Sequence, residues 1–258
     1  MKEYVFREPL LEGVILSRQG SVALTANLQG SSVYCHFPAR GRLSGIRLSG
    51  RPCLLSQSNS PERRTPYTVE AFSLNRPEDE KKRWIGLNRY AVKEYVTHYL
   101  PRREFMNMLQ DAKQVSPCGS IAGMKTDFRI GDTYLLLQTP MQELNILPPA
   151  EIQANPNQSA PFGIRMVKQL RRIAENIGKK QRLIILLCYL YDSPPTVLCR
   201  KNESAYGDVR SALEFMHLRG VEIWQANFRV EPERVWLIRN FAICPDNIDG
   251  TGIKKTVR

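Results

Sequence analysis

The sequence predicts a mixed α and β protein with two parts, because two different patterns follow one another along the chain. Up to about residue 80, short strand-like stretches are separated by closely spaced glycines, which is typical of a small β-barrel or sandwich. Beyond that point, helical and strand-like stretches alternate, which is typical of a mixed α/β domain. A charged stretch with a proline, residues 75–83, separates the two patterns. We therefore place the domains at residues 1–80 and 81–258.

The first part owes its β assignment to alternation of apolar side chains. Leu11, Val14 and Leu16 alternate with polar neighbours, and so do Val22 and Leu24. Further strands are predicted at residues 33–37, 51–56 and 68–74.

The second part contains a predicted hairpin. Met124–Ile130 and Thr133–Gln138 read as strands, and Gly131-Asp132 reads as the turn between them. The consecutive apolar residues 134–137 indicate a strand buried on both faces. Helices are predicted at 91–100, 102–112, 162–177 and 208–219, and strands at 183–191, 221–228 and 235–241.

Asp127 on this hairpin indicates a scaffold for metal-dependent nuclease chemistry. Such a site needs a second carboxylate and a lysine on the neighbouring strand, because Mg²⁺ is held by oxygen ligands and a cation stabilises the developing charge. The two positions that face Asp127 are Leu136 and Gln138. Neither side chain can act as the second carboxylate or as the cation. We therefore expect no cofactor, and Asp127 remains as a catalytic remnant and vestigial metal ligand.

The net charge of +12 predicts a polyanionic partner, nucleic acid before a membrane surface. The six cysteines lack the spacing of a zinc site, and the longest apolar run, residues 183–190, is too short to span a bilayer. The chain opens without a signal peptide, so we expect a cytoplasmic protein.

Basic residues gather in two groups that suit phosphate binding. Arginine pairs with phosphates through two donors, and aromatic rings offer bases a stacking surface. The first group lies in the β-rich part and consists of arginines interleaved with aromatic residues: Arg40 and Arg42 beside Tyr34, His36 and Phe37, followed by Arg47, Arg51, Arg63, Arg64 and Tyr67. The second lies on the predicted helix 162–177 and consists of Arg165, Lys168, Arg171 and Arg172. The structural alternative for each group is an ordinary solvated face.

Several motifs resemble the sugar fermentation stimulation protein A (SfsA) family over most of the chain. HFPARGRL (residues 36–43) is similar to the family's C-P-N-T-G-R-M, and SQSNSPERRTPY (residues 56–67) is similar to S-x-S-x-N-P-x-R-K-x-P-Y. IGLN (residues 85–88) fits V-G-V-N, TDF (residues 126–128) fits R-I-D-F, and residues 165–173 fit R-G-Q-K-H-L-R-E-L. Residues 221–237 fit the closing strands.

The resemblance implies an N-terminal OB-like β-barrel followed by a restriction-endonuclease-like α/β domain of the PD-(D/E)xK type. It also implies DNA binding, a prokaryotic cytoplasmic protein and a link to sugar metabolism, and some family members are annotated nucleases. The sequence departs from the family where catalysis would occur. The family's Glu-x-Lys becomes Leu136-x-Gln138, and its acidic pair in an earlier helix falls on Thr97 and His98. The family's R-x-x-R-F segment near the start is reduced to Arg18, which the resemblance adds to the nucleic-acid-binding candidates.

These observations favour a non-catalytic nucleic-acid-binding protein, with DNA as the favoured partner, on a degenerate nuclease scaffold. One alternative is an active Mg²⁺-dependent nuclease, with Asp132 or Glu143 as the second carboxylate and Lys168 as the cation. Another is a protein-interaction module whose basic face binds an acidic partner. The sequence leaves open whether the chain forms a homo-oligomer.

Overall fold

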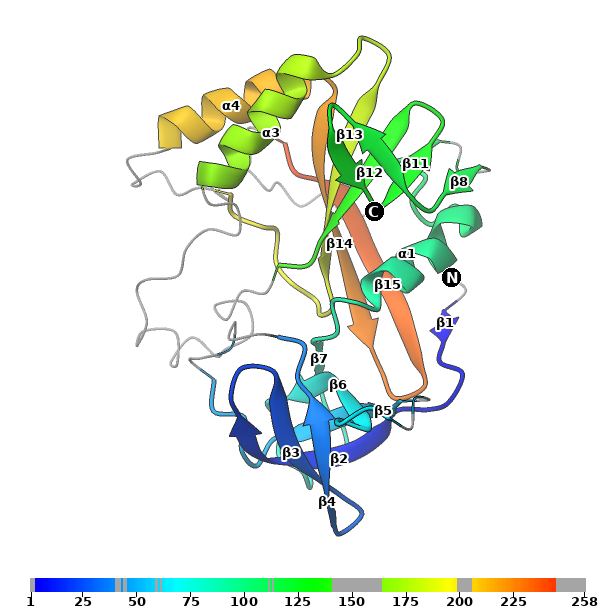
Figure 1. Ribbon diagram of the computed structural model, residues 1–258, viewed down its shortest axis with the longest axis vertical. Coiled ribbons are helices and arrows are strands. Elements are labelled where there is room, and N and C mark those ends of the chain that lie inside the picture. The colour runs from blue at the N-terminus through cyan, green and yellow to red at the C-terminus, as the bar shows by residue number, and fades with distance from the viewer. Residues whose placement is uncertain are drawn as a thin grey trace.

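The computed structural model contains two main sheets, one above the other in Figure 1. It describes residues 3–39, 43, 46–58, 60, 62–110, 112, 114–140, 164–198 and 206–244, without the side chains of residues 164–166. No helix in these ranges is long and apolar enough to cross a membrane.

The lower sheet is a closed barrel. Its order is β4 (Ser31–His36), β3 (Ala23–Leu28), β2 (Leu11–Gln19), β5 (Pro52–Gln57), β6 (Tyr67–Ser73) and β7 (Trp84–Gly86). The barrel closes where β4 pairs with β6, Cys35 opposite Tyr67. Alternate side chains such as Ile15, Leu24 and Cys35 fill its interior. The β-barrel prediction is confirmed.

The upper sheet has a parallel centre and antiparallel edges. Its order is β1 (Tyr4–Val5), β15 (Arg234–Ala242), β14 (Val221–Val230), β13 (Arg182–Tyr189), β12 (Thr133–Gln138), β11 (Phe128–Ile130) and β8 (Val115–Ser116). Strands β12, β13 and β14 are parallel. A separate two-stranded sheet pairs β9 (Gly119–Ile121) with β10 (Met124–Thr126).

Helices cover both faces of the upper sheet. Helix α1 (Val92–Tyr99), followed by the 3-10 turn η1 (Leu100–Arg102), packs with Ile184 and Leu186 of β13. Helices α3 (Ile164–Asn176) and α4 (Tyr206–Leu218) pack with the alternate residues Leu183 and Ile185. Because β13 is apolar toward both layers, its uninterrupted hydrophobic run is explained. The prediction of a mixed α/β region is confirmed.

Three local predictions differ from the structure. The helix predicted at 102–112 is replaced by η1 and turns, because Pro101 and a left-handed Arg103 (φ 61°) stop the helix. The strand predicted at 124–130 is divided at Asp127 into β10 and β11. Tyr4 and Val5 pair with β15, so these two residues join the upper sheet instead of the barrel. The domain boundary at residue 80 stays a prediction.

The barrel meets the upper sheet at Gly86, the last residue of β7. The Gly86 N–H donates a 2.8 Å hydrogen bond to the carbonyl of Leu190, just beyond β13. A Cβ atom on Gly86 would lie 2.4 Å from the Leu190 Cβ and 2.9 Å from a methyl group of Val230. Only glycine permits this approach, so Gly86 determines how closely the two sheets pack.

We expect Gly86→Ala to lower the free energy of unfolding by about 2 kcal/mol, because overpacking of a filled junction forces neighbouring groups apart. Denaturant unfolding followed by circular dichroism measures this change. Gly207→Ala is the matched control, since a Cβ there meets nothing within 4 Å, and it should leave stability equal or slightly higher. Equal stability of Gly86→Ala and the wild type would contradict the tight junction.

Candidate nucleic-acid interface and metal-site remnant

Asp127 lies between β10 and β11 and forms hydrogen bonds with the backbone of β12. Its N–H donates to the Leu135 carbonyl at 2.9 Å, and its Oδ2 accepts from the Leu137 N–H at 2.8 Å. The charge of Asp127 also contributes to the raised pKa of the buried Cys188 thiol, for which burial is the main cause. The Asp127 carboxylate therefore acts as a hydrogen-bond acceptor for the strand beside it.

The neighbours of Asp127 do not supply the rest of a metal site. Leu136 packs partly buried against the hydrophobic core, and Gln138 carries no charge. Within the described ranges, no three His, Cys, Asp or Glu side chains gather closely enough to hold a metal ion. A Mg²⁺ ion needs near-ideal octahedral oxygen ligation. The described residues around Asp127 therefore do not fit a Mg²⁺ site.

Neither Asp132 nor Glu143, the two alternatives for the second carboxylate, is placed by the structure beside Asp127. Asp132 occupies the exposed turn that joins Ile130 to Thr133, at the far end of the hairpin from Asp127. The intervening strand separates the two residues by about 13 Å, whereas two ligands of one ion must lie within a few ångströms of each other. Glu143 lies outside the described residues. Lys168 is exposed on α3.

The chain between β5 and β6, which the structure describes at residues 58, 60 and 62–66, forms a loop that we name the arginine loop. The Ser58 N–H donates to the Pro66 carbonyl at 2.7 Å and closes the loop at its base. The Arg63 N–H donates to the Ser60 carbonyl at 3.3 Å. Arg63 and Arg64 are both exposed near its tip. The loop therefore presents two predicted phosphate-binding side chains to solvent.

A buried carboxylate lies beside this loop. Glu70 is 6% exposed, and its Oε1 accepts from the Ser56 hydroxyl at 2.6 Å and from the Asn88 amide at 3.0 Å. Burial raises the pKa of Glu70, while the hydrogen bonds from Ser56 and Asn88 and the charge of Arg63 act in the opposite direction. Two stretches that carry the family resemblance, at Ser56 and Asn88, thus converge on one residue that the motifs did not contain.

The other predicted nucleic-acid-binding residues of the barrel that the structure describes are less accessible to a ligand, because they contact other parts of the protein. The Arg18 guanidinium lies 5.0 Å from the centre of the Phe37 ring, and its Nε donates to the Gly20 carbonyl at 3.0 Å. Tyr67 is half-buried and packs against the core. Arg40 and Arg42 lie outside the described residues.

Helix α3, which carries the second basic group, lies at the opposite end of the molecule from the barrel (Figure 1). Lys168 and Arg172 are exposed and one helical turn apart. Arg171 is engaged, since it lies 3.7 Å from the Glu175 carboxylate and 5.4 Å from the Phe215 ring centre on α4. The side chain of Arg165 is outside the described part of the structure.

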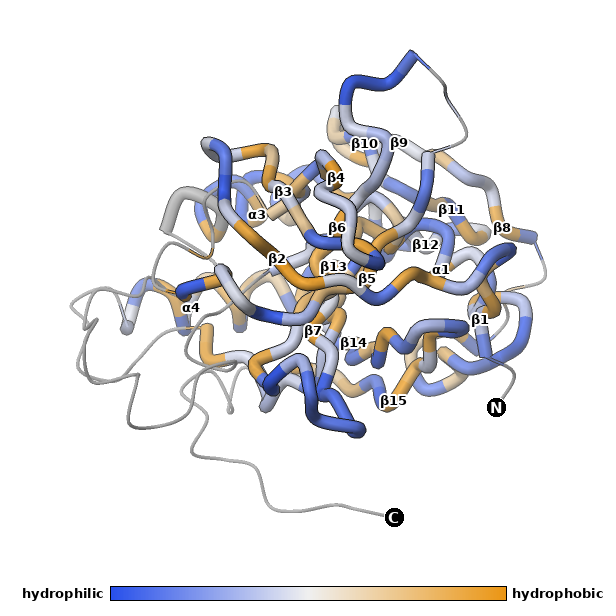
Figure 2. The backbone as a smooth tube through the Cα atoms, turned by 90° about the horizontal axis from the view of Figure 1, so that it is seen from below, coloured by the Kyte–Doolittle hydropathy of each residue, from blue (hydrophilic) through white to orange (hydrophobic). Residues whose placement is uncertain are grey.

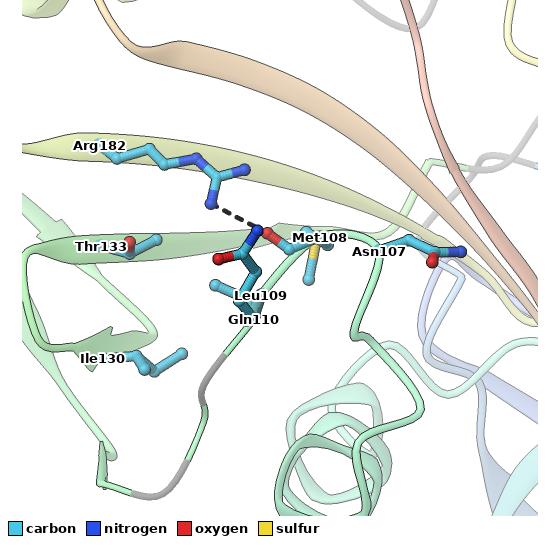
Figure 3. Close-up of a pocket in the computed structure, with 7 residues that line it drawn as sticks. All are labelled: Asn107, Met108, Leu109, Gln110, Ile130, Thr133 and Arg182. Carbon is cyan, nitrogen blue, oxygen red and sulfur yellow. Dashed lines mark hydrogen bonds between the residues drawn. The ribbon is translucent and has the colours of Figure 1, made fainter.

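A pocket of about 480 Å³ opens where β12 and β13 begin (Figure 3). Arg182 lines it, donates to the Met108 carbonyl at 2.9 Å and forms a two-pronged ion pair with Glu222. Burial alone would raise the pKa of Glu222, but Arg182 and Trp224 bind its carboxylate and the net pKa is lowered. Because Glu222 neutralises Arg182, this pocket is not an anion site.

The fold and these sites define a protein with an N-terminal OB barrel joined to a mixed α/β region. The family model described as the SfsA N-terminal OB domain matches residues 20–87. Sugar fermentation stimulation protein homologs are similar in sequence: one from Bdellovibrio bacteriovorus is 32% identical over 103 residues, which are 38% of this chain and 40% of that protein. Another, from Picosynechococcus, is 36% identical over 116 residues, 44% of this chain and 45% of that protein.

The alignments thus span less than half the length of these relatives. The solved structure of Pyrococcus furiosus SfsA in complex with Ca²⁺ has the same fold, with a TM-score of 0.62 at 14% identity, covering 93% of this chain and 98% of that one. The chain is therefore similar in sequence and in fold to sugar fermentation stimulation (SfsA) proteins.

Stability should depend on pH through Glu70. Because folding raises the pKa of Glu70 above its ordinary value of 4.5, the folded chain binds more protons than the unfolded chain in the window above pH 4.5. This contribution is fully present below pH 4.5 and is lost as the pH rises through the raised pKa. We expect Glu70→Gln to remove that decline, measured by thermal unfolding across the pH range.

Glu80→Gln, at an exposed position, is the control and should keep the wild-type pH profile. A Glu70→Gln profile parallel to that of the wild type would show that Glu70 does not titrate abnormally.

Proposed function

We propose that this chain is a nucleic-acid-binding protein, with DNA as the favoured partner, and that it binds without cleaving. The observation that carries the proposal is the exposed arginine loop on an OB barrel. Loops and strand faces of OB folds are a common binding site for oligonucleotides. Arg63 and Arg64 offer two-pronged donors for phosphate at that loop.

The charge of the whole chain supports this proposal. A net charge of +12 gives long-range attraction for a polyanion and speeds its association. In the proposal the arginine loop is the principal contact, and Lys168 and Arg172 on α3 supply further phosphate contacts. Arg18 and Arg171 have a smaller part, because each is already engaged within the protein.

We further propose that the upper sheet and its helices are a nuclease-like scaffold without catalytic function. In this proposal Asp127 corresponds to the first metal-binding carboxylate of such a scaffold. Its Oδ2 accepts a hydrogen bond from the backbone, and among the described residues no cluster of acids forms beside it. The similar P. furiosus structure contains Ca²⁺. In this chain we expect binding to proceed without Mg²⁺ as a cofactor.

The relatives are named for stimulation of sugar fermentation, and a DNA-binding protein suits a regulatory role of that kind. We place this activity in the cytoplasm. The five cysteines among the described residues are free thiols, as a reducing compartment would keep them.

Replacement of Arg63 or Arg64 by alanine should weaken binding and reduce its salt dependence. Each lost phosphate contact releases about one counterion fewer, so the slope of log K against log salt should become shallower by about 0.9 on duplex DNA and about 0.7 on a single strand. We expect affinity at low salt to fall about tenfold for the double variant. Fluorescence anisotropy with labelled DNA over a series of salt concentrations measures both quantities.

Arg210→Ala is the matched control, because it removes one positive charge on α4, where Arg210 already pairs with Glu214 at 2.9 Å. Its salt slope should equal that of the wild type. If the wild type binds DNA weakly and without salt dependence, and instead copurifies with an acidic protein, the nucleic-acid proposal is wrong and a protein-interaction role replaces it.

A further inference from the structure

A row of side chains crosses the outer surface of the barrel and ends in an exposed tyrosine. Ser17 on β2 pairs with Thr25 on β3, and Thr25 pairs with Tyr34 on β4. The hydroxyls of Ser17 and Thr25 lie 2.9 Å apart. Cys35, the residue after Tyr34, is fully buried inside the barrel, and Val33 packs partly buried against the core. Tyr34 therefore projects outward, with 38% of its surface exposed.

The residues around Tyr34 on the outer surface of the barrel are small and polar. Its cross-strand neighbours are small hydroxyl residues, and Ser32, two positions earlier on the same face of β4, is small and exposed. Strand β4 pairs with β6 only at Cys35 and His36, so residues 31–34 extend beyond the closure of the barrel. An exposed aromatic ring among small polar groups can stack against a planar ligand.

The pairing of β4 with β6 brings the arginine loop close to Tyr34 in space. Tyr67, the first residue of β6, pairs with Cys35, the immediate neighbour of Tyr34. Arg64 precedes Tyr67 by three residues, so its Cα lies within about 11 Å of the Tyr67 Cα. An aromatic surface and cationic side chains side by side are the two elements with which proteins bind unpaired nucleic acid.

The positions of Tyr34 and the arginine loop within the barrel also favour nucleic-acid binding. Strands β3 and β4 are the second and third strands of the barrel, and the arginine loop joins its fourth and fifth. In OB folds, the face of the second and third strands and the loop between the fourth and fifth are the surfaces that bind oligonucleotides. Figure 2 shows β2, β3 and β4 on the side of the molecule toward the viewer, away from β14 and β15.

We propose that Tyr34 is a stacking platform for an unpaired base, so that the barrel prefers single-stranded nucleic acid to duplex. This inference rests on the proposed nucleic-acid-binding function. In a duplex the faces of the bases are covered by their neighbours, whereas a single strand can turn a base onto an exposed ring. The arginine loop then holds the phosphates beside the stacked base.

The test compares the binding of a labelled oligothymidylate of about 15 nucleotides, within the usual site size of one OB fold, with binding of a duplex of equal length. Tyr34→Ala should weaken single-strand binding about 5- to 150-fold, the range for loss of one stacking contact. Duplex binding should change less than twofold by the same measurement. Tyr34→Phe keeps the ring and should bind like the wild type.

The salt slope separates this contact from the arginines. Tyr34 carries no charge, so Tyr34→Ala should lower single-strand affinity without changing the slope. Tyr90→Ala is the matched control, because Tyr90 is 52% exposed and lies after β7, outside the barrel strands. It should bind both substrates as the wild type does.

Each outcome has a distinct meaning. If the wild type binds neither substrate, the proposed function itself fails. If the wild type binds and Tyr34→Ala binds the single strand equally well, the stacking inference fails while the proposed function stands. An equal loss on single strand and duplex, or a loss in Tyr34→Phe as large as in Tyr34→Ala, would also overturn stacking.

Discussion

The close approach of Gly86 to Leu190 determines how the two parts of the molecule fit together. The hydrogen bond between them joins the last barrel strand to the chain just beyond β13, where a side chain at position 86 would collide. The next residue, Leu87, donates its N–H to the carbonyl of Glu70 at 2.7 Å. The barrel, its buried carboxylate and the upper sheet are therefore linked within two residues of chain, and the arginine loop is held in place beside them.

The residues that carry the family resemblance serve packing more directly than chemistry. Ser56 and Asn88 come from separate motifs, yet both donate to Glu70. Asp127 likewise stays in place as an acceptor for the Leu137 N–H, a role that needs no metal. A carboxylate with a structural role of this kind can persist after the charged groups opposite it are replaced. The hydrogen bond from the Leu137 N–H therefore gives Asp127 a structural role beside β12.

The sequence was informative where one physical pattern controlled the outcome. Alternation predicted the barrel strands, and the apolar run of residues 183–191 predicted the buried strand β13. The prediction that residues 134–137 are buried on both faces is wrong for Leu136 and Leu137, which are only partly buried in β12. The sequence was less informative where contacts between distant segments, or single residues that stop a helix, determine the local structure. The apolar stripe of residues 102–112 indicated a helix, but Pro101 and the left-handed Arg103 prevented it. Strand β1 has two residues and forms by pairing with β15.

The same limit applies to the candidate site. Glu70 is an acid within an apolar strand, and this pattern is the sequence signal of a buried polar network. The outward direction of Tyr34 is known only from the structure.

The most direct test of the central claim is an assay of the intact protein with labelled single- and double-stranded DNA, with and without Mg²⁺ or Mn²⁺, in which binding and cleavage are measured in the same samples. The structure around Asp127 predicts binding that falls steeply with salt and no cleavage with either metal, because one engaged carboxylate does not hold Mg²⁺. Metal-dependent cleavage that Asp127→Ala abolishes would contradict the account and would mean that residues outside the described ranges complete an active site.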